Sequence, residues 1–293
     1  MNIPVVDLSD FVSGDEPRKQ KFVQELGKAY EEVGFVAVKN HGIPDDLIAD
    51  LYKYVQQFFS LPDEVKLSYE KKELAGQRGY TSFGREHAKG FDAPDLKEFF
   101  QYGQTVEDGE KTEDYPDNVV VDEVPQFTPT LYKAYRNFEK SGQSLLQAIA
   151  LYLGLDENYF DEWVHNGNSI LRAIHYPPIK NEPKSAIRAE QHEDINLITL
   201  LVGASADGEE INRKTGKRKA LHGVLFYFKK VDSCRLFSAV QGQLIKHPPK
   251  DWWFFQSYLI PVKEFAQCGS VFLILPSCLP SRFAATSFFP LVH

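Results

Sequence analysis

A histidine and an aspartate two residues apart, His192 and Asp194, are the residues whose types and spacing best suit metal chemistry in this chain. Alternate side chains of a β-strand face the same side, so these two would project together while Glu193 points away. A neutral imidazole and a carboxylate on one face can bind a divalent metal ion, and one distant histidine would complete a triad that leaves positions open on Fe(II). A His-x-Asp pair alone is common, so its surroundings decide its meaning.

The residues after this pair indicate that it lies at the mouth of a β-core. Residues 197–202 read LITLLV, which is typical of a buried strand. After residue 168, short apolar runs alternate with turn residues, which favours an all-β sandwich or barrel. These runs cover residues 170–176, 196–202, 223–228 and 253–260.

The first half of the chain indicates a mixture of helices and strands. Short apolar runs predict strands at residues 3–8 and 35–38. Residues 76–90 are glycine-rich and polar, so we expect a loop there. Apolar residues at helical spacing predict helices at residues 17–33, 44–58, 129–153 and 156–165. The fold class is therefore mixed α and β, with a helical N-terminal part leading into a β-rich core.

Composition narrows the class of protein. The 293 residues carry a net charge of −8, which argues against nucleic acid as a partner. No apolar stretch reaches the roughly 18 residues of a membrane span, and the first residues lack the pattern of a secretory signal. The three cysteines form no CxxC pair, so we expect a cytoplasmic protein. Nothing in the sequence indicates the oligomeric state.

Three ordered segments resemble the Fe(II)/2-oxoglutarate-dependent oxygenases of the isopenicillin N synthase type. They are residues 3–8 (IPVVDL), 34–43 (GFVAVKNHGI) and 192–201 (HEDINLITLL), and the similarity extends over residues 1–208. The resemblance implies a double-stranded β-helix (jelly-roll) core that holds iron through His192 and Asp194. It also implies an oxidoreductase that uses Fe(II), 2-oxoglutarate and O₂ to oxidise a small organic substrate. The N-terminal segment, including the loop at 76–90, and the C-terminal tail would recognise that substrate.

The resemblance assigns two further residues. In this family a tyrosine directly before a proline, on an early core strand, contacts the co-substrate carboxylate, and residues 170–177 (ILRAIHYP) make Tyr176 the candidate. His175 should face the other way and serve the structure. The family also has a distal histidine ligand, and His247, which lies 53 positions after Asp194 and directly before two prolines, is the candidate here.

One expected residue type is missing. The family's Arg-x-Ser strand aligns with residues 256–261, but Ser257 stands at the arginine position and Leu259 at the serine position. No arginine lies between Arg235 and Arg282. Because a buried dicarboxylate needs a cation, ideally a guanidinium, two alternatives stay open. One is an iron-dependent oxidase that does not use 2-oxoglutarate, and the other is a non-catalytic jelly-roll protein that binds a metal or small ligand.

The expected organisation has four parts: a non-haem dioxygenase-type region at 1–120, a helical connection at 121–167, the jelly-roll core at 168–265 and a tail at 266–293. The tail departs in composition, because only two of residues 264–293 are charged. Either this region has diverged and lost catalytic parts, or its reported sequence is wrong.

Overall fold

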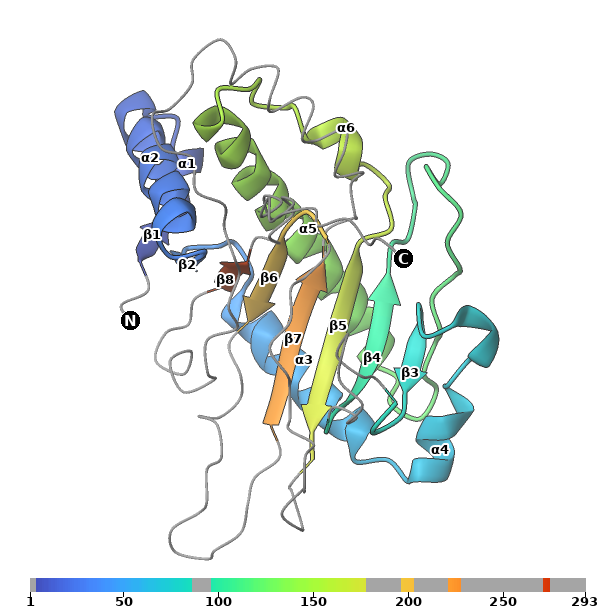
Figure 1. Ribbon diagram of the computed structural model, residues 1–293. Coiled ribbons are helices and arrows are strands. Elements are labelled where there is room, and N and C mark those ends of the chain that lie inside the picture. Colours follow the sequence, from blue (N-terminus) through green and yellow to red (C-terminus); the bar gives the residue numbers. More distant parts are fainter. Residues whose placement is uncertain (1–3, 86–95, 178–195, 203–220, 228–270, 275–293) are drawn as a thin grey trace, which may run out of the picture.

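Long helices pack on one face of a mixed β-sheet in the computed structural model of this protein, which describes residues 4–85, 96–177, 196–202, 221–227 and 271–274 (Figure 1). The strands are β1 (Val5–Asp7), β2 (Phe35–Lys39), β3 (Gly79–Thr81), β4 (Glu98–Gly103), β5 (Ile170–Tyr176), β6 (Thr199–Val202), β7 (Leu221–Tyr227) and β8 (Val271–Ile274). The helices are α1 (Leu8–Val12), α2 (Glu16–Glu32), α3 (Asp45–Phe59), α4 (Asp63–Ser68), the 3₁₀ turn η1 (Lys72–Leu74), α5 (Phe127–Tyr152) and α6 (Asp161–Val164). The mixed α and β class is thus confirmed.

Within the described ranges the strands form one sheet of eight in the order β1-β2-β8-β6-β7-β5-β4-β3. Only the β1–β2 pair is parallel among these; the other neighbouring pairs are antiparallel. Both edges of the sheet come from the first 103 residues, and its centre comes from strands after residue 169. The N-terminal part therefore contributes strands as well as helices to the sheet.

Most helices lie where the apolar spacing predicts them. α2 is capped at its N-terminus by Asp15, whose side chain accepts a hydrogen bond from the backbone N–H of Arg18 at 3.0 Å. It ends before Gly34, which takes a φ of +78° and donates to two carbonyls of the last turn. β2, α3, α5 and β5 also match their predicted ranges within a few residues.

Three expectations differ from the structure. β3 lies inside the expected loop at 76–90, where three residues pair with β4 despite the neighbouring glycines. The helix expected at 156–165 is reduced to α6, because residues 157–160 form a turn. β6 begins at Thr199 rather than at residue 196. β4 and β8 had no prediction. The strand expected at 253–260 lies outside the described residues.

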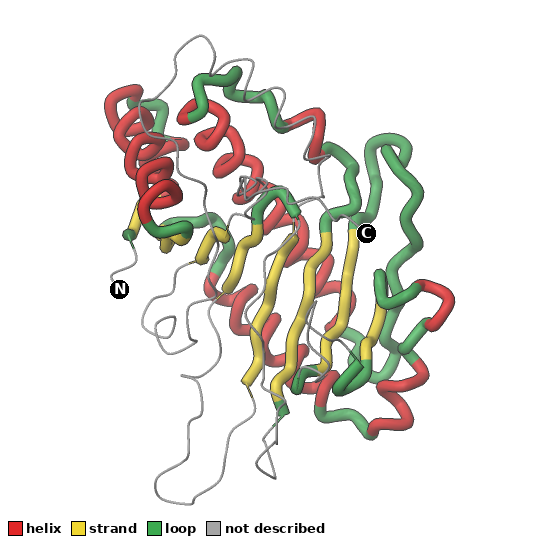
Figure 2. Tube along the Cα trace, in the orientation of Figure 1, coloured by secondary structure: helices red, strands yellow, loops and turns green. Residues whose placement is uncertain are grey.

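The two faces of the sheet differ in what covers them. Figure 2 shows helices α3 and α5 behind the sheet. Leu171, Ala173 and Phe100 are fully buried on that side, and a stacked ring pair, Phe58 and Phe127, packs between the helices and the sheet with centroids 4.8 Å apart. None of the helices in the described part of the chain is long and apolar enough to cross a membrane. On β4 and β5, the side chains that alternate with Phe100, Leu171 and Ala173 point to the opposite face of the sheet.

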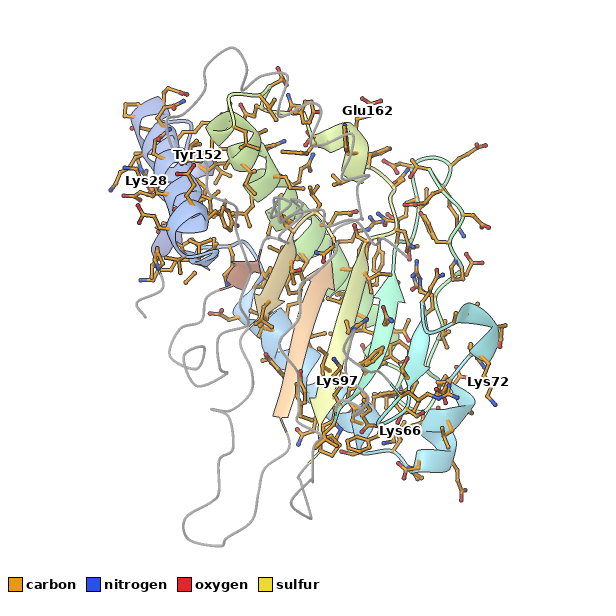
Figure 3. All side chains as sticks on the ribbon, viewed as in Figure 1. Lys28, Lys66, Lys72, Lys97, Tyr152 and Glu162 are labelled. Carbon is orange, nitrogen blue, oxygen red and sulfur yellow. The ribbon has the colours of Figure 1, made fainter. Side chains whose placement is uncertain are left out.

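One close helix contact depends on a glycine. Gly27 of α2 lies so near α5 that a Cβ atom there would stand 2.1–2.2 Å from three ring carbons of Tyr152, which is labelled in Figure 3. An added methyl group cannot be accommodated unless the tyrosine ring or the helix moves. The two helices therefore approach each other at a position that only glycine permits.

We predict that Gly27→Ala lowers the free energy of unfolding by about 1–3 kcal/mol, because overpacking outweighs the better helix propensity of alanine. Urea unfolding measures this. In a Tyr152→Ala background the same substitution should be neutral or stabilising, since the ring that it meets is gone. Equal costs of Gly27→Ala in both backgrounds would contradict the contact.

Candidate active site

The structure describes one of the four residues expected at the site. Tyr176 is the last residue of β5, whereas His192, Asp194 and His247 lie outside the described residues. Among the described residues, no three His, Cys, Asp or Glu side chains gather as a metal site. The predicted ligand set is therefore neither brought together nor separated by the structure.

Side-chain hydrogen bonds hold the chain in place where it enters the sheet after the His-x-Asp pair. The Asn196 side-chain amide donates to the carbonyl of Ile198 at 2.6 Å and to the hydroxyl of Thr199 at 2.8 Å. Thr199 is fully buried and opens β6, which lies between β7 and β8. The segment that carries the pair thus leads within five residues into a central strand, as its apolar continuation predicts.

Tyr176 stands at the far end of β5 from the start of β6. Thr199 and Ile170 both pair with Tyr227, so β6 begins level with the start of β5. Tyr176 is six residues farther along, which is about 20 Å in an extended strand. The five residues from Asp194 to Thr199 can span at most about 17 Å. Tyr176 and Asp194 can therefore reach one site if the chain before Thr199 runs back toward the Tyr176 end of the sheet.

A buried carboxylate lies beneath this end of the sheet. Glu98 of β4, only 3% exposed, accepts from Lys66 Nζ at 2.9 Å and from the Tyr80 hydroxyl, and its Oε1 lies 2.6 Å from Nδ1 of His175. The His175 ring also packs on Phe59, with centroids 5.1 Å apart. His175 thus turns away from the face of Tyr176 and holds the structure, as predicted. Figure 3 labels Lys66 near the strand ends that this cluster joins.

The electrostatics of this cluster favour the charged carboxylate. Burial alone would raise the pKa of Glu98, but hydrogen bonds from His175, Tyr80 and Lys66 outweigh it, so the pKa lies below its ordinary value. Burial and the neighbouring Glu98 in turn raise the pKa of Tyr80. The four side chains connect α4, β3, β4 and β5, and so fix the strand that ends at Tyr176. No sequence pattern revealed this cluster, since its members lie far apart in the chain.

An open hollow of about 520 Å³ lies on the sheet face that does not pack on the helices. Arg172 and Gln101 pair across β5 and β4 in this hollow, and the Arg172 guanidinium lies 4.3 Å from the ring centroid of Phe99. Its described lining is Glu70, Lys71, Lys72, Ala75, Gly76, Tyr80, Thr81, Arg85, Phe99, Gln101 and Arg172. Residues from the expected loop at 76–90, among them Gly76, Thr81 and Arg85, therefore border this hollow.

We predict that Glu98→Gln lowers the free energy of unfolding by about 3 kcal/mol near neutral pH, because it leaves the buried Lys66 charge with only the exposed carboxylate of Asp63 as its ionic partner. The stabilisation from a carboxylate with a lowered pKa is present above its ordinary value of 4.5 and is lost as the pH falls through the lowered value. The difference between the two proteins should therefore shrink below pH 4.5 in urea unfolding series. Glu64→Gln, on the exposed side of α4, is the matched control and should change stability by less than about 0.5 kcal/mol. A difference that stays constant with pH would contradict this account of Glu98.

Comparison with known proteins agrees with the resemblance of the motifs. A family model described as the N-terminal region of non-haem dioxygenase in morphine synthesis matches residues 3–123. The chain is 32% identical to the proline hydroxylase buaE of Petromyces alliaceus, over 73% of this chain and 68% of the relative. It is 31% identical to the 2-oxoglutarate-dependent dioxygenase ecdK of Aspergillus rugulosus, over 72% and 68%.

Solved structures agree as well. A Caulobacter crescentus protein assigned to the 2OG-Fe(II) oxygenase family superposes with a TM-score of 0.66 and 31% identity, over 94% of this chain and 86% of that one. A full-length Neurospora crassa protein in complex with alpha-KG superposes with a TM-score of 0.63 and 25% identity, over 95% and 80%. This chain therefore belongs to the Fe(II)- and 2-oxoglutarate-dependent oxygenase family.

Proposed function

We propose that this chain is an oxidoreductase that uses Fe(II), 2-oxoglutarate and O₂ to oxidise a small organic substrate. The observation that carries the proposal is identity above 30% to two relatives named as a proline hydroxylase and a 2-oxoglutarate-dependent dioxygenase, across two thirds of their length. A further solved complex of the Neurospora crassa protein contains thymine together with alpha-KG, so that neighbour takes a small molecule as well as the co-substrate. For this chain we propose only the class of substrate, a small organic molecule.

His192, Asp194 and His247 are our proposed iron ligands. Two imidazoles and one carboxylate suit Fe(II) and leave coordination positions for co-substrate and O₂. Bound iron would supply the oxidative chemistry, and the chain would orient the reactants and exclude water. The Asn196 hydrogen bonds hold the start of the strand that follows the first two proposed ligands.

Tyr176 is our proposed contact for the 2-oxoglutarate carboxylate. It is half-buried, and the cluster around Glu98 fixes the end of its strand. The serine at position 257 removes the arginine that the family motif provides, so the hydroxyl of Tyr176 would carry a larger share of the binding.

The jelly-roll core and the four-part organisation at 1–120, 121–167, 168–265 and 266–293 belong to the same proposal. The superposition on 2OG-Fe(II) oxygenases supports the jelly-roll core, of which the described sheet would form one of the two sheets, and the four-part organisation rests on the sequence. The cytoplasmic location and the absence of a nucleic-acid partner stay predictions from composition.

We predict that Asp194→Ala weakens Fe(II) binding by more than about 100-fold, because loss of a mere outer-shell partner of a metal ligand already costs roughly 10–100-fold. Anaerobic Fe(II) titration of the full chain measures the affinity, and circular dichroism checks the fold. Glu193→Gln is the matched control, since its side chain should point away from the metal. Equal iron affinity in wild type and Asp194→Ala would rule out the ligand assignment.

We predict that Tyr176→Phe weakens 2-oxoglutarate binding by about tenfold or more and leaves iron affinity unchanged, because the variant loses one hydrogen bond to a charged group. The readout is the visible charge-transfer band of the iron–oxoacid chelate, titrated anaerobically. The same 2-oxoglutarate affinity in both proteins would remove Tyr176 from the site. Iron binding without any band in the wild type would favour the oxidase or the non-catalytic alternative.

A further inference from the structure

The hollow on the open face of the sheet carries a charge opposite to that of the whole chain. Its described lining has four cationic side chains, Lys71, Lys72, Arg85 and Arg172, and one carboxylate, Glu70. The protein as a whole has a net charge of −8. Low-dielectric walls lined by one sign of charge attract ligands of the other sign, so this hollow favours an anion.

The cations at the rim are engaged with nearby groups or exposed to solvent. Arg85 forms an ion pair with Glu70 at 2.8 Å, and Lys71 Nζ donates to the carbonyl of Ser68 at 2.9 Å. Lys72, labelled in Figure 3, is exposed, so salt screens its charge. These residues can attract an anion but are poorly placed to orient one.

Arg172 differs from the rim cations in how it is held. It is half-buried in the middle of β5, and its guanidinium lies over the Phe99 ring at 4.3 Å. Gln101, directly opposite on β4, donates its amide to the carbonyl of Gly76 and so ties the neighbouring loop to the sheet. A planar guanidinium held in this way matches the geometry of a carboxylate.

We propose that Arg172 binds, in this hollow, a carboxylate of the substrate that the enzyme oxidises. The inference rests on the proposed function, and it adds the substrate class, an organic acid. Arg172 lies four residues, about 13 Å, before Tyr176 on the same strand face, so the hollow is separate from the contact proposed for 2-oxoglutarate. The hollow is also bordered by Gly76, Thr81 and Arg85, from the segment that we expect to recognise the substrate.

The probes are three small acids, benzoate, phenylacetate and cinnamate, each paired with its neutral primary amide. Ligand-observed NMR on the full chain measures their affinities, both without iron and with anaerobic Fe(II) and 2-oxoglutarate. At least one acid should bind the wild type about tenfold or more tightly than its amide, and Arg172→Gln should abolish this preference. Lys72→Gln is the matched control and should reduce acid binding by no more than about threefold. Arg172→Lys keeps the charge without the fork and should fall between.

Two results would overturn the inference. One is that no acid binds better than its amide, or that Arg172→Gln keeps the preference. The other is that Arg172→Gln loses the iron–2-oxoglutarate band, since Arg172 would then serve the co-substrate. Absence of that band in the wild type would instead count against the proposed function, and the iron-free measurements would still decide whether Arg172 selects acids. Thermal unfolding of each variant confirms that it is folded.

Discussion

The ionised carboxylate of Glu98, buried where four elements meet, is the constraint on which the described sheet most depends. A buried charge is tolerated only when it is fully paired, and here Lys66, Tyr80 and His175 satisfy it together. Because these partners come from α4, β3 and β5, the carboxylate can be accommodated only when those elements are in place. The same cluster therefore specifies the edge of the sheet and holds the strand on which Tyr176 lies.

Side chains along β4 and β5 alternate between the two faces of the sheet. Those that hold the structure lie on one face, and those that a ligand can reach lie on the other. Phe100, Ala173 and His175 face the helices, where packing and the Glu98 cluster leave little room for change. Arg172 lies on the other face with its cross-strand partner Gln101, beside an open hollow. A strand of seven residues thus contributes to the core on one side and offers polar groups to a ligand on the other.

Local patterns in the sequence predict part of this arrangement and miss part of it. α2, α5 and β5 follow from apolar spacing, because that signal is contained within each element. The Glu98 cluster could not be predicted, because Lys66, Tyr80 and His175 look like ordinary residues until the fold brings them together. β8 was missed because its apolar run lies in a tail almost without charged residues, where no alternation marks a strand. The proposed iron ligands rest on their motif and on the relatives.

The order of strands in the sheet also determines when each strand can pair during translation. β2 pairs with β8, about 230 residues later in the chain, so this ladder has a very high contact order. While a ribosome makes the intervening residues, β2 presents an unpaired apolar edge next to β1. A nascent chain of this kind keeps that edge unpaired until β8 has been made, and an unpaired apolar strand edge of this sort favours association with other chains.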